Sequence, residues 1–169
     1  MAIMEPVSKY AAKTAFPVPI VRMIVTDDRE RVLILRRDGT GHAHGEWCLP
    51  GGKVDYGVTV EQAVRDELRE ETGLDCLAAE FLFYQDSPPS ESGEMHCINL
   101  YFVCRTAGEM KINHESSASA WIARDQPDAP ALVFGNDAAL GRYWASVDAE
   151  RGPAPCAHPD AGDRPSGWT

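Results

Sequence analysis

The sequence lacks every cysteine pattern that marks a zinc site or a disulfide framework. Its five cysteines, Cys48, Cys76, Cys97, Cys104 and Cys156, contain no CxxC pair, and their number is odd. This spacing excludes a zinc ribbon and argues against a small secreted domain stapled by disulfides. We therefore expect reduced thiols and a cytoplasmic protein.

Positive charge and long apolar runs are also scarce. The chain has 16 Lys and Arg against 26 Asp and Glu, which gives a formal net charge of −10. Such acidity disfavours general binding to nucleic acid or to anionic membranes. No apolar run approaches the ~20 residues of a membrane span, and the N-terminus has no signal-peptide core. We therefore expect no membrane partner. The hydrophobic fraction of 44% over 169 residues suits one globular domain.

The most informative stretch is a glycine-rich loop, residues 51–58, followed by a helix that begins after Thr59. Thr59 and Gln62 fit a capping box, in which the Thr hydroxyl accepts from the third helical amide and the Gln side chain reaches back. Gly73 suits the left-handed residue that ends a helix. At 3.6 residues per turn, one apolar arc forms from Val60, Ala63, Val64 and Leu68.

Carboxylates share the packing side of this helix. Glu67 and Glu71 fall inside the apolar arc and Glu70 borders it, and no Lys or Arg of the helix turns their way. An ionised carboxylate left unpaired in a poor dielectric costs on the order of 3 kcal/mol or more. A bound divalent cation would remove that cost, and clustered oxygen ligands suit Mg²⁺ or Mn²⁺. The alternative is a solvated, ion-paired helix, which accounts for Arg65 and Arg69 but not for the two inward acids.

These residues resemble the signature box of the Nudix hydrolases. That box is a Gly, a Glu after five residues, and then Arg-Glu-apolar-x-Glu-Glu-x-Gly-apolar. The matching positions are Gly52, Glu67, Leu68, Glu70, Glu71, Gly73 and Leu74, and Leu49-Pro50-Gly51-Gly52 resembles the usual lead-in. The match spans 23 residues with many fixed positions, whereas the rest of the chain agrees with the family only in element order. The resemblance implies an α/β protein with the Nudix-type α/β/α sandwich around a mixed β-sheet.

Two positions depart from the family pattern. Val58 stands where the box has its first Glu, and Asp66 stands where it has Arg. Arg65 lies one residue early, about 100° around the helix, so it cannot substitute. In the family these two positions help to hold the box, so their loss bears on catalytic efficiency more than on metal binding. Asp66 also adds negative charge beside Glu70 and is a further candidate for the metal site.

The resemblance implies a reaction and its metal. It implies hydrolysis of the diphosphate linkage in a nucleoside diphosphate joined to another group, with water as the nucleophile and Mg²⁺ or Mn²⁺ as the cofactor. Glu67, Glu70 and Glu71 would bind the metal, together with the backbone carbonyl of Gly51. The general base stays open between Glu67, Glu115 on a later loop, and the weaker candidate Glu94. A binding module that senses a nucleotide with little turnover is the alternative function, and it is motivated by the two departures.

Substrate contacts are harder to place. Arg36 and Arg37 end the second predicted strand and are candidates for binding a substrate phosphate, and two solvated charges are the alternative. We interpret His42 and His44 as loop polarity. Pro89, fifteen residues after Leu74, resembles a proline of the ADP-ribose-hydrolysing branch, although a turn would also explain it. We favour ADP-ribose or a nucleotide sugar, with nucleoside triphosphates next.

The pattern of branched residues predicts five strands, at residues 18–26, 31–36, 76–85, 95–105 and 118–124, with the first two joined in a hairpin. A final helix is expected from Asn136 or Asp137, with its packing side formed by Leu140, Tyr143, Trp144 and Val147. The domain spans residues 18–150. Residues 1–17 form an extension, which either packs on the partner subunit of a homodimer or is a loose lead, and residues 151–169 form a disordered tail.

Overall fold

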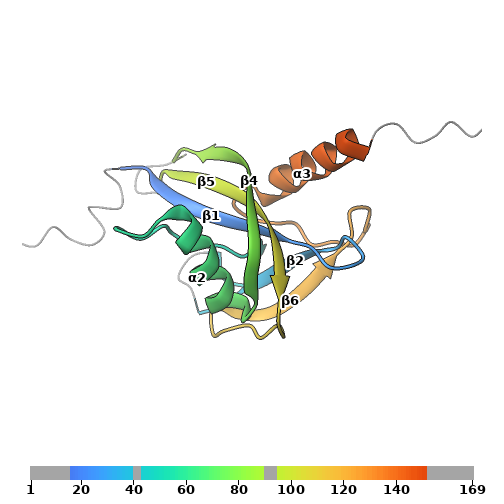
Figure 1. Ribbon diagram of the computed structural model, residues 1–169, viewed down its shortest axis with the longest axis horizontal. Coiled ribbons are helices and arrows are strands. Elements are labelled where there is room, and N and C mark those ends of the chain that lie inside the picture. The colour runs from blue at the N-terminus through green and yellow to red at the C-terminus, as the bar shows by residue number, and fades with distance from the viewer. Residues whose placement is uncertain (1–15, 40–42, 90–94, 152–169) are drawn as a thin grey trace, which may run out of the picture.

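The computed structural model describes residues 16–39, 43–89 and 95–151, which form two three-stranded sheets and two helices (Figure 1). The first sheet has the order β1-β5-β4 and is mixed, because β1 (Val18–Val25) runs parallel to β5 (Cys97–Ala107) and β4 (Asp75–Ser87) runs antiparallel to it. The second sheet is antiparallel, with β2 (Val32–Arg37) between β3 (Trp47–Cys48) and β6 (Ser116–Ile122).

The predicted hairpin of the first two strands is wrong. A single bridge, Thr26 to Val32, joins them, and β1 instead pairs with β5 from Val18–Cys97 to Val25–Cys104. The other edge of β1 is taken by residues 50–53, because the amides of Val21 and Met23 donate to the carbonyls of Gly52 and Pro50 at 2.9 Å. Both edges of β1 are therefore occupied, and β2 begins a separate sheet.

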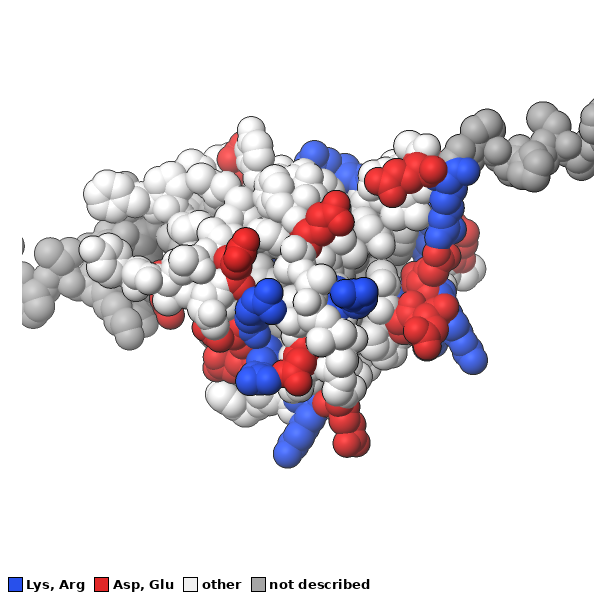
Figure 2. Space-filling view, in the orientation of Figure 1, with Lys and Arg blue, Asp and Glu red and all other residues white. Residues whose placement is uncertain are grey.

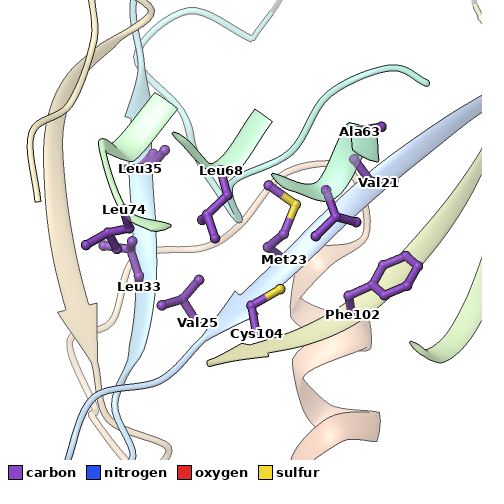
Figure 3. Packing of buried hydrophobic residues seen from close by; sticks show 11 residues of the cluster. Val21, Met23, Val25, Leu33, Leu35, Ala63, Leu68, Leu74, Phe102 and Cys104 are labelled. Carbon is purple, nitrogen blue, oxygen red and sulfur yellow. The ribbon is translucent and has the colours of Figure 1, made fainter. Parts of the chain in front are cut away.

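Each helix covers one face of the strands, which confirms the α/β/α sandwich. Helix α2 (Val60–Thr72) lies over a core cluster in which Ala63 and Leu68 pack with Val21, Met23 and Phe102 (Figure 3). Helix α3 (Asn136–Arg151) covers the opposite face, where its Ala139 and Leu140 pack with a second cluster formed by Ile24, Val32, Ile34, Leu49, Tyr101, Ile122 and Leu132. Alternate residues of β1 thus serve the two cores.

The ends of α2 follow the predicted signals with one exception. The Thr59 hydroxyl accepts from the Gln62 amide at 3.2 Å, and Gly73 has a φ of 71° with its N–H donating to the Arg69 carbonyl at 2.9 Å. The Gln62 side chain does not reach back, because its amide nitrogen donates to Asp66 Oδ1 at 2.7 Å. Only half of the capping box forms. The helix is therefore fixed at both ends, and it presents the same face along its whole length.

Helix α3 begins at Asn136, with Leu140 buried and Tyr143, Trp144 and Val147 half-buried. Asn136 and Asp137, predicted as alternative caps, are its first two residues, and their side chains accept from the amides of Leu49 and Leu132 instead. Residues 1–15 and 152–169 lie outside the described part, as do His42, Glu94 and Cys156, so the predictions made for them remain predictions. The four cysteines within it are free thiols. No described helix is both long enough and apolar enough to cross a membrane. The face drawn in Figure 2 carries acidic and basic side chains side by side, and its described residues form no broad basic surface there.

Candidate active site

The backbone at Gly51 and Gly52 is pressed between β1 and the acidic side of α2. Because the carbonyls of Pro50 and Gly52 face β1, the Gly51 peptide groups face the other way, and its N–H donates to Glu71 Oε2 at 2.8 Å. A Cβ atom on Gly51 would overlap the Val21 carbonyl, and one on Gly52 would overlap the Glu67 carboxylate. Backbone approach requires glycine at position 51, whereas at position 52 a larger residue would displace the Glu67 carboxylate.

The two inward acids are electrostatically strained. Glu71 is only 8% exposed, and burial raises its pKa to about 7 although the Gly51 N–H lowers it. Half-buried Glu67 has its pKa raised to about 7 by burial, and next by the charges of Glu70 and Glu115. Each of the two pKa values is also raised by Glu115, so the loop before β6 does bring this residue to the acidic face of α2. The positions predicted for Glu67, Glu71 and Glu115 are thus brought together.

On the outer side of α2, unlike the inner side, the acidic side chains are exposed to solvent. Glu70 and Asp66 are exposed, and both act on Glu67 by raising its pKa. The arginines turn away from these acids: Arg65 donates to the Cys76 carbonyl at 2.7 Å, and Arg69 pairs with Asp75. The solvated, ion-paired description therefore holds for the outer side of the helix and leaves the inward acids without a cation of their own helix.

The donor set fits a hard divalent cation in chemistry, although the described residues contain no three acidic, His or Cys side chains that converge closely enough to hold one as they stand. Such a cation would neutralise the negative charges of Glu67, Glu70 and Glu71, which repel one another. The Gly51 carbonyl, turned away from β1, accepts no backbone hydrogen bond from the described residues. That these four groups hold a metal ion stays a prediction.

A further polar group borders the acids. Asn113 donates its backbone N–H to the Glu71 carbonyl at 3.3 Å, and its side-chain oxygen accepts from the Glu115 amide at 2.9 Å. The other side-chain atom, Nδ2, is buried and has no hydrogen-bond partner in the described structure. A buried donor without a partner is rare, and this one belongs to the residue that links the end of α2 to the Glu115 loop. The sequence offered no signal for Asn113, because it lies in a polar loop of unremarkable composition.

Arg22, which the sequence analysis missed, is the second unexpected residue. It lies on β1 beneath Gly51 and is only 7% exposed, and its Nε donates to Asn99 Oδ1 at 3.4 Å. Burial lowers the pKa of its guanidinium, whereas the charge of Glu71 is among those that raise it. The sequence did contain a signal for Arg22, because it is the only charged residue in the run of branched residues 18–25.

The structure separates the two arginines predicted to bind substrate. Exposed Arg36 donates from Nε to the Gly45 carbonyl at 2.9 Å. Half-buried Arg37 instead places its guanidinium carbon 5.2 Å from the centroid of the Phe134 ring, and Arg22 approaches the same ring at 4.7 Å. Arg37 therefore lies beside Arg22, and Arg36 lies beside a surface loop. In that loop His44 contacts Asp38 at 3.5 Å, which agrees with its interpretation as loop polarity.

Comparisons with known proteins agree with the fold and identify the family. The family model described as "NUDIX domain" matches residues 17–142. The nucleoside triphosphatase NudI of Escherichia coli O139:H28 is 33% identical over 112 residues, which cover 61% of this chain and 79% of that protein. A crystal structure of the MutT NUDIX hydrolase from Burkholderia pseudomallei is 28% identical with a TM-score of 0.66, covering 75% of this chain and 97% of that one. The NUDIX domain of Shewanella oneidensis NrtR, solved with ADP ribose, shares the fold at 18% identity, a TM-score of 0.67, and coverage of 79% and 90%.

Proposed function

The chain belongs to the NUDIX domain family, and from that premise we propose that it hydrolyses the diphosphate linkage of a nucleoside phosphate derivative with a bound Mg²⁺ or Mn²⁺. The observation that carries the proposal is the paired approach of two strained carboxylates to two glycines, Glu71 to Gly51 and Glu67 to Gly52. Without a cation, this arrangement concentrates negative charge on the buried side of a helix.

Each group of the site has a role in this proposal. Glu67, Glu70 and Glu71 hold the metal with the Gly51 carbonyl, and the Gly51 N–H fixes the orientation of the Glu71 carboxylate. A divalent cation held there would neutralise substrate phosphates and lower the pKa of the attacking water. Asn113 would hold the loop that carries Glu115 against the end of α2, through its contacts with the Glu71 carbonyl and the Glu115 amide.

The candidates for the general base are still Glu67, Glu115 and Glu94. Burial raises the pKa of Glu67 to about 7 in the metal-free protein, and a bound cation would lower it, so Glu67 would be ionised and able to accept a proton in the loaded site. The charge of Glu115 is among the causes that raise that pKa, which supports a role for Glu115 in taking the proton or in tuning Glu67. Glu94, the third candidate, lies outside the described residues. We propose Glu67 as the base and Glu115 as its tuning partner.

The substrate class is a nucleoside 5′-di- or triphosphate derivative. A 33%-identical relative is named as a nucleoside triphosphatase, and a more distant neighbour was solved with ADP ribose. Pro89, which favoured ADP-ribose, is exposed at the edge of the described β4–β5 connection, and nothing there ties it to the site. Nucleoside triphosphates and ADP-ribose compounds therefore enter one panel with equal standing.

The test is release of nucleoside monophosphate from that panel with Mg²⁺ or Mn²⁺, compared between the wild type and Glu70→Gln. We expect product from at least one compound in the wild type and a loss of product in the variant. Product that forms equally well in a metal-free reaction with chelator would contradict the proposal.

A second function is favoured by Val58 and Asp66, the two departures from the box. Val58 is 37% exposed and can accept no hydrogen bond through its side chain, and Asp66 adds repulsion to Glu67. A site weakened in this way would suit a nucleotide-sensing module. Tight binding by some compound of the panel, with no product from any, supports this second function over the first.

A further inference from the structure

Arg22 is a buried charge that forms no ion pair with a carboxylate of the described residues, although the charge of Glu71 acts on it. Among the described residues it makes one hydrogen bond, to Asn99, and it takes part in none of the ion pairs. Asn99 is itself 2% exposed and donates onward to Ser87 Oγ at 3.1 Å, so the contact is held in place. Burying a guanidinium without an anion is costly, and proteins rarely retain such a group for stability.

The surroundings of Arg22 add to the cost. The guanidinium of Arg37 lies near the same Phe134 ring, and its charge lowers the pKa of Arg22. Cation–π contact with one ring offsets only part of the cost of burying a guanidinium. Phe134 itself has a φ of 63°, a left-handed conformation that is strained for a bulky residue and that often marks a functional position. The guanidinium groups of Arg22 and Arg37 therefore lie close together at the ring of Phe134, whose backbone is strained.

This spot adjoins the acidic site. The Cδ atom of Arg22 is 3.1 Å from where a Cβ on Gly51 would lie, and Gly51 in turn donates to Glu71. The Gly51 backbone thus separates an acidic cluster suited to a cation from an arginine that lacks an anion. A substrate with two linked phosphates has the charge to meet both, one phosphate at the metal and the next at the arginine.

We propose that Arg22 is a substrate-binding residue whose guanidinium, beside that of Arg37, binds a phosphate group across the Gly51 backbone from Glu71. The inference rests on the proposed function for the identity of the ligand as a nucleotide phosphate. It assigns to β1 a contact that neither the signature box nor the predicted arginine pair contains. The competing role is purely structural: as a strut, Arg22 would only hold Asn99 in place and offset the charge of Glu71.

Stability separates the two roles. A strut that is replaced by a neutral residue of similar length loses stability, as most partners of buried polar groups do. A ligand-binding charge that is unpaired in the free protein loses nothing or gains when Met replaces it, because its desolvation is removed. Arg22→Met should therefore keep or raise the melting temperature while it weakens binding.

The probe is imidodiphosphate, a non-hydrolysable diphosphate, with binding measured by calorimetry in Mg²⁺. We expect Arg22→Met to weaken its binding about tenfold or more, the loss expected for a charge-assisted contact. Arg65→Met is the matched control, because it removes an exposed arginine from the far side of α2 and should bind like the wild type. On an active substrate, Arg22→Met should raise KM more than it lowers kcat.

Binding of imidodiphosphate by Arg22→Met at wild-type affinity would overturn the inference, whatever its melting temperature. If Arg22→Met does not fold, Arg22→Lys replaces it: the charge remains and the planar fork is lost, so weakened binding supports the inference and unchanged binding overturns it. The proposed function fails separately, when no panel compound is hydrolysed by a wild type that still binds the probe through Arg22.

Discussion

The Glu67 carboxylate occupies the space that a side chain at position 52 would need, so Gly52 and Glu67 fit together only while position 52 has no Cβ. This contact couples the loop before α2 to the acid that we propose as the base. The neighbouring Gly51 meets backbone instead, because a Cβ there would overlap the Val21 carbonyl on β1. Glycine thus occupies these two adjacent positions for different physical reasons.

Gly52→Ala should lower activity more than stability. The new methyl group displaces the end of a flexible side chain, and a shift of about 1 Å in a catalytic group can cost about 100-fold in kcat/KM. Gly51→Ala should instead destabilise the fold by about 3 kcal/mol or more, because backbone atoms cannot move aside. Steady-state kinetics and chemical denaturation of both variants check this. A soluble, fully stable Gly51→Ala protein would contradict the assigned role.

Much of this site was predictable from the sequence, because it depends on local chemistry. Helical periodicity placed Glu67 and Glu71 on the packing side of α2, and the cap signals at Thr59 and Gly73 fixed its ends. The partner of β1 was not predictable in this way. Pairing with β5 spans about 80 residues and depends on which strand edges remain free, which no local pattern reports.

Arg22 and Asn113 were missed for the same reason. Their importance lies in contacts with residues distant in sequence: Arg22 with Asn99 and Phe134, and Asn113 with Glu71. Arg36 and Arg37 show the converse case, because adjacent residues end in different surroundings. The register shift in the β2–β6 pairing falls between them, and local sequence does not reveal such a bulge.

Stability of the metal-free protein should fall as pH rises from about 4.5 to about 7. Glu71 has a folded-state pKa raised to about 7 from an ordinary value of 4.5, so the folded state holds a proton that the unfolded state has released. Where the folded state binds more protons, the free energy of unfolding decreases with pH, here by on the order of 1 kcal/mol or more over this window. Urea denaturation at several pH values measures it.

Glu71→Gln isolates that effect, because the amide does not titrate. The difference in unfolding free energy between the variant and the wild type should grow in favour of the variant up to about pH 7 and then level off. Glu61→Gln, an exposed change on the outer side of α2, is the control and should keep the wild-type slope. A wild-type slope in Glu71→Gln would show that Glu71 does not titrate in this range.

Added Mg²⁺ or Mn²⁺ should raise the melting temperature, and should do so more at pH 8 than at pH 5.5. Protons and metal compete for the same carboxylates, so the cation gains most where Glu67 and Glu71 are ionised. We expect a rise of about 3 °C or more at pH 8, as about 1 kcal/mol of binding free energy gives in a protein of this size. Thermal denaturation measures it, and the rise should be lost in Glu70→Gln and Glu71→Gln. An equal rise in those variants would place the cation elsewhere.

The double change Val58→Glu with Asp66→Arg should raise turnover. The negative charge of Asp66 raises the pKa of Glu67, so an arginine at position 66 should lower that pKa and reduce the repulsion within the acidic cluster. The double change would also restore the family's residues at both positions. Both are needed because a glutamate at position 58 alone adds a negative charge without a partner. We expect kcat/KM to rise by about tenfold, the effect of roughly 1.4 kcal/mol, and its acidic limb to move to lower pH. Single variants made alongside should fall short of the double variant. A fall in turnover in the double variant, with its melting temperature unchanged, would instead mean that the site depends on Asp66 itself, whose oxygen already receives the Gln62 amide one helical turn away.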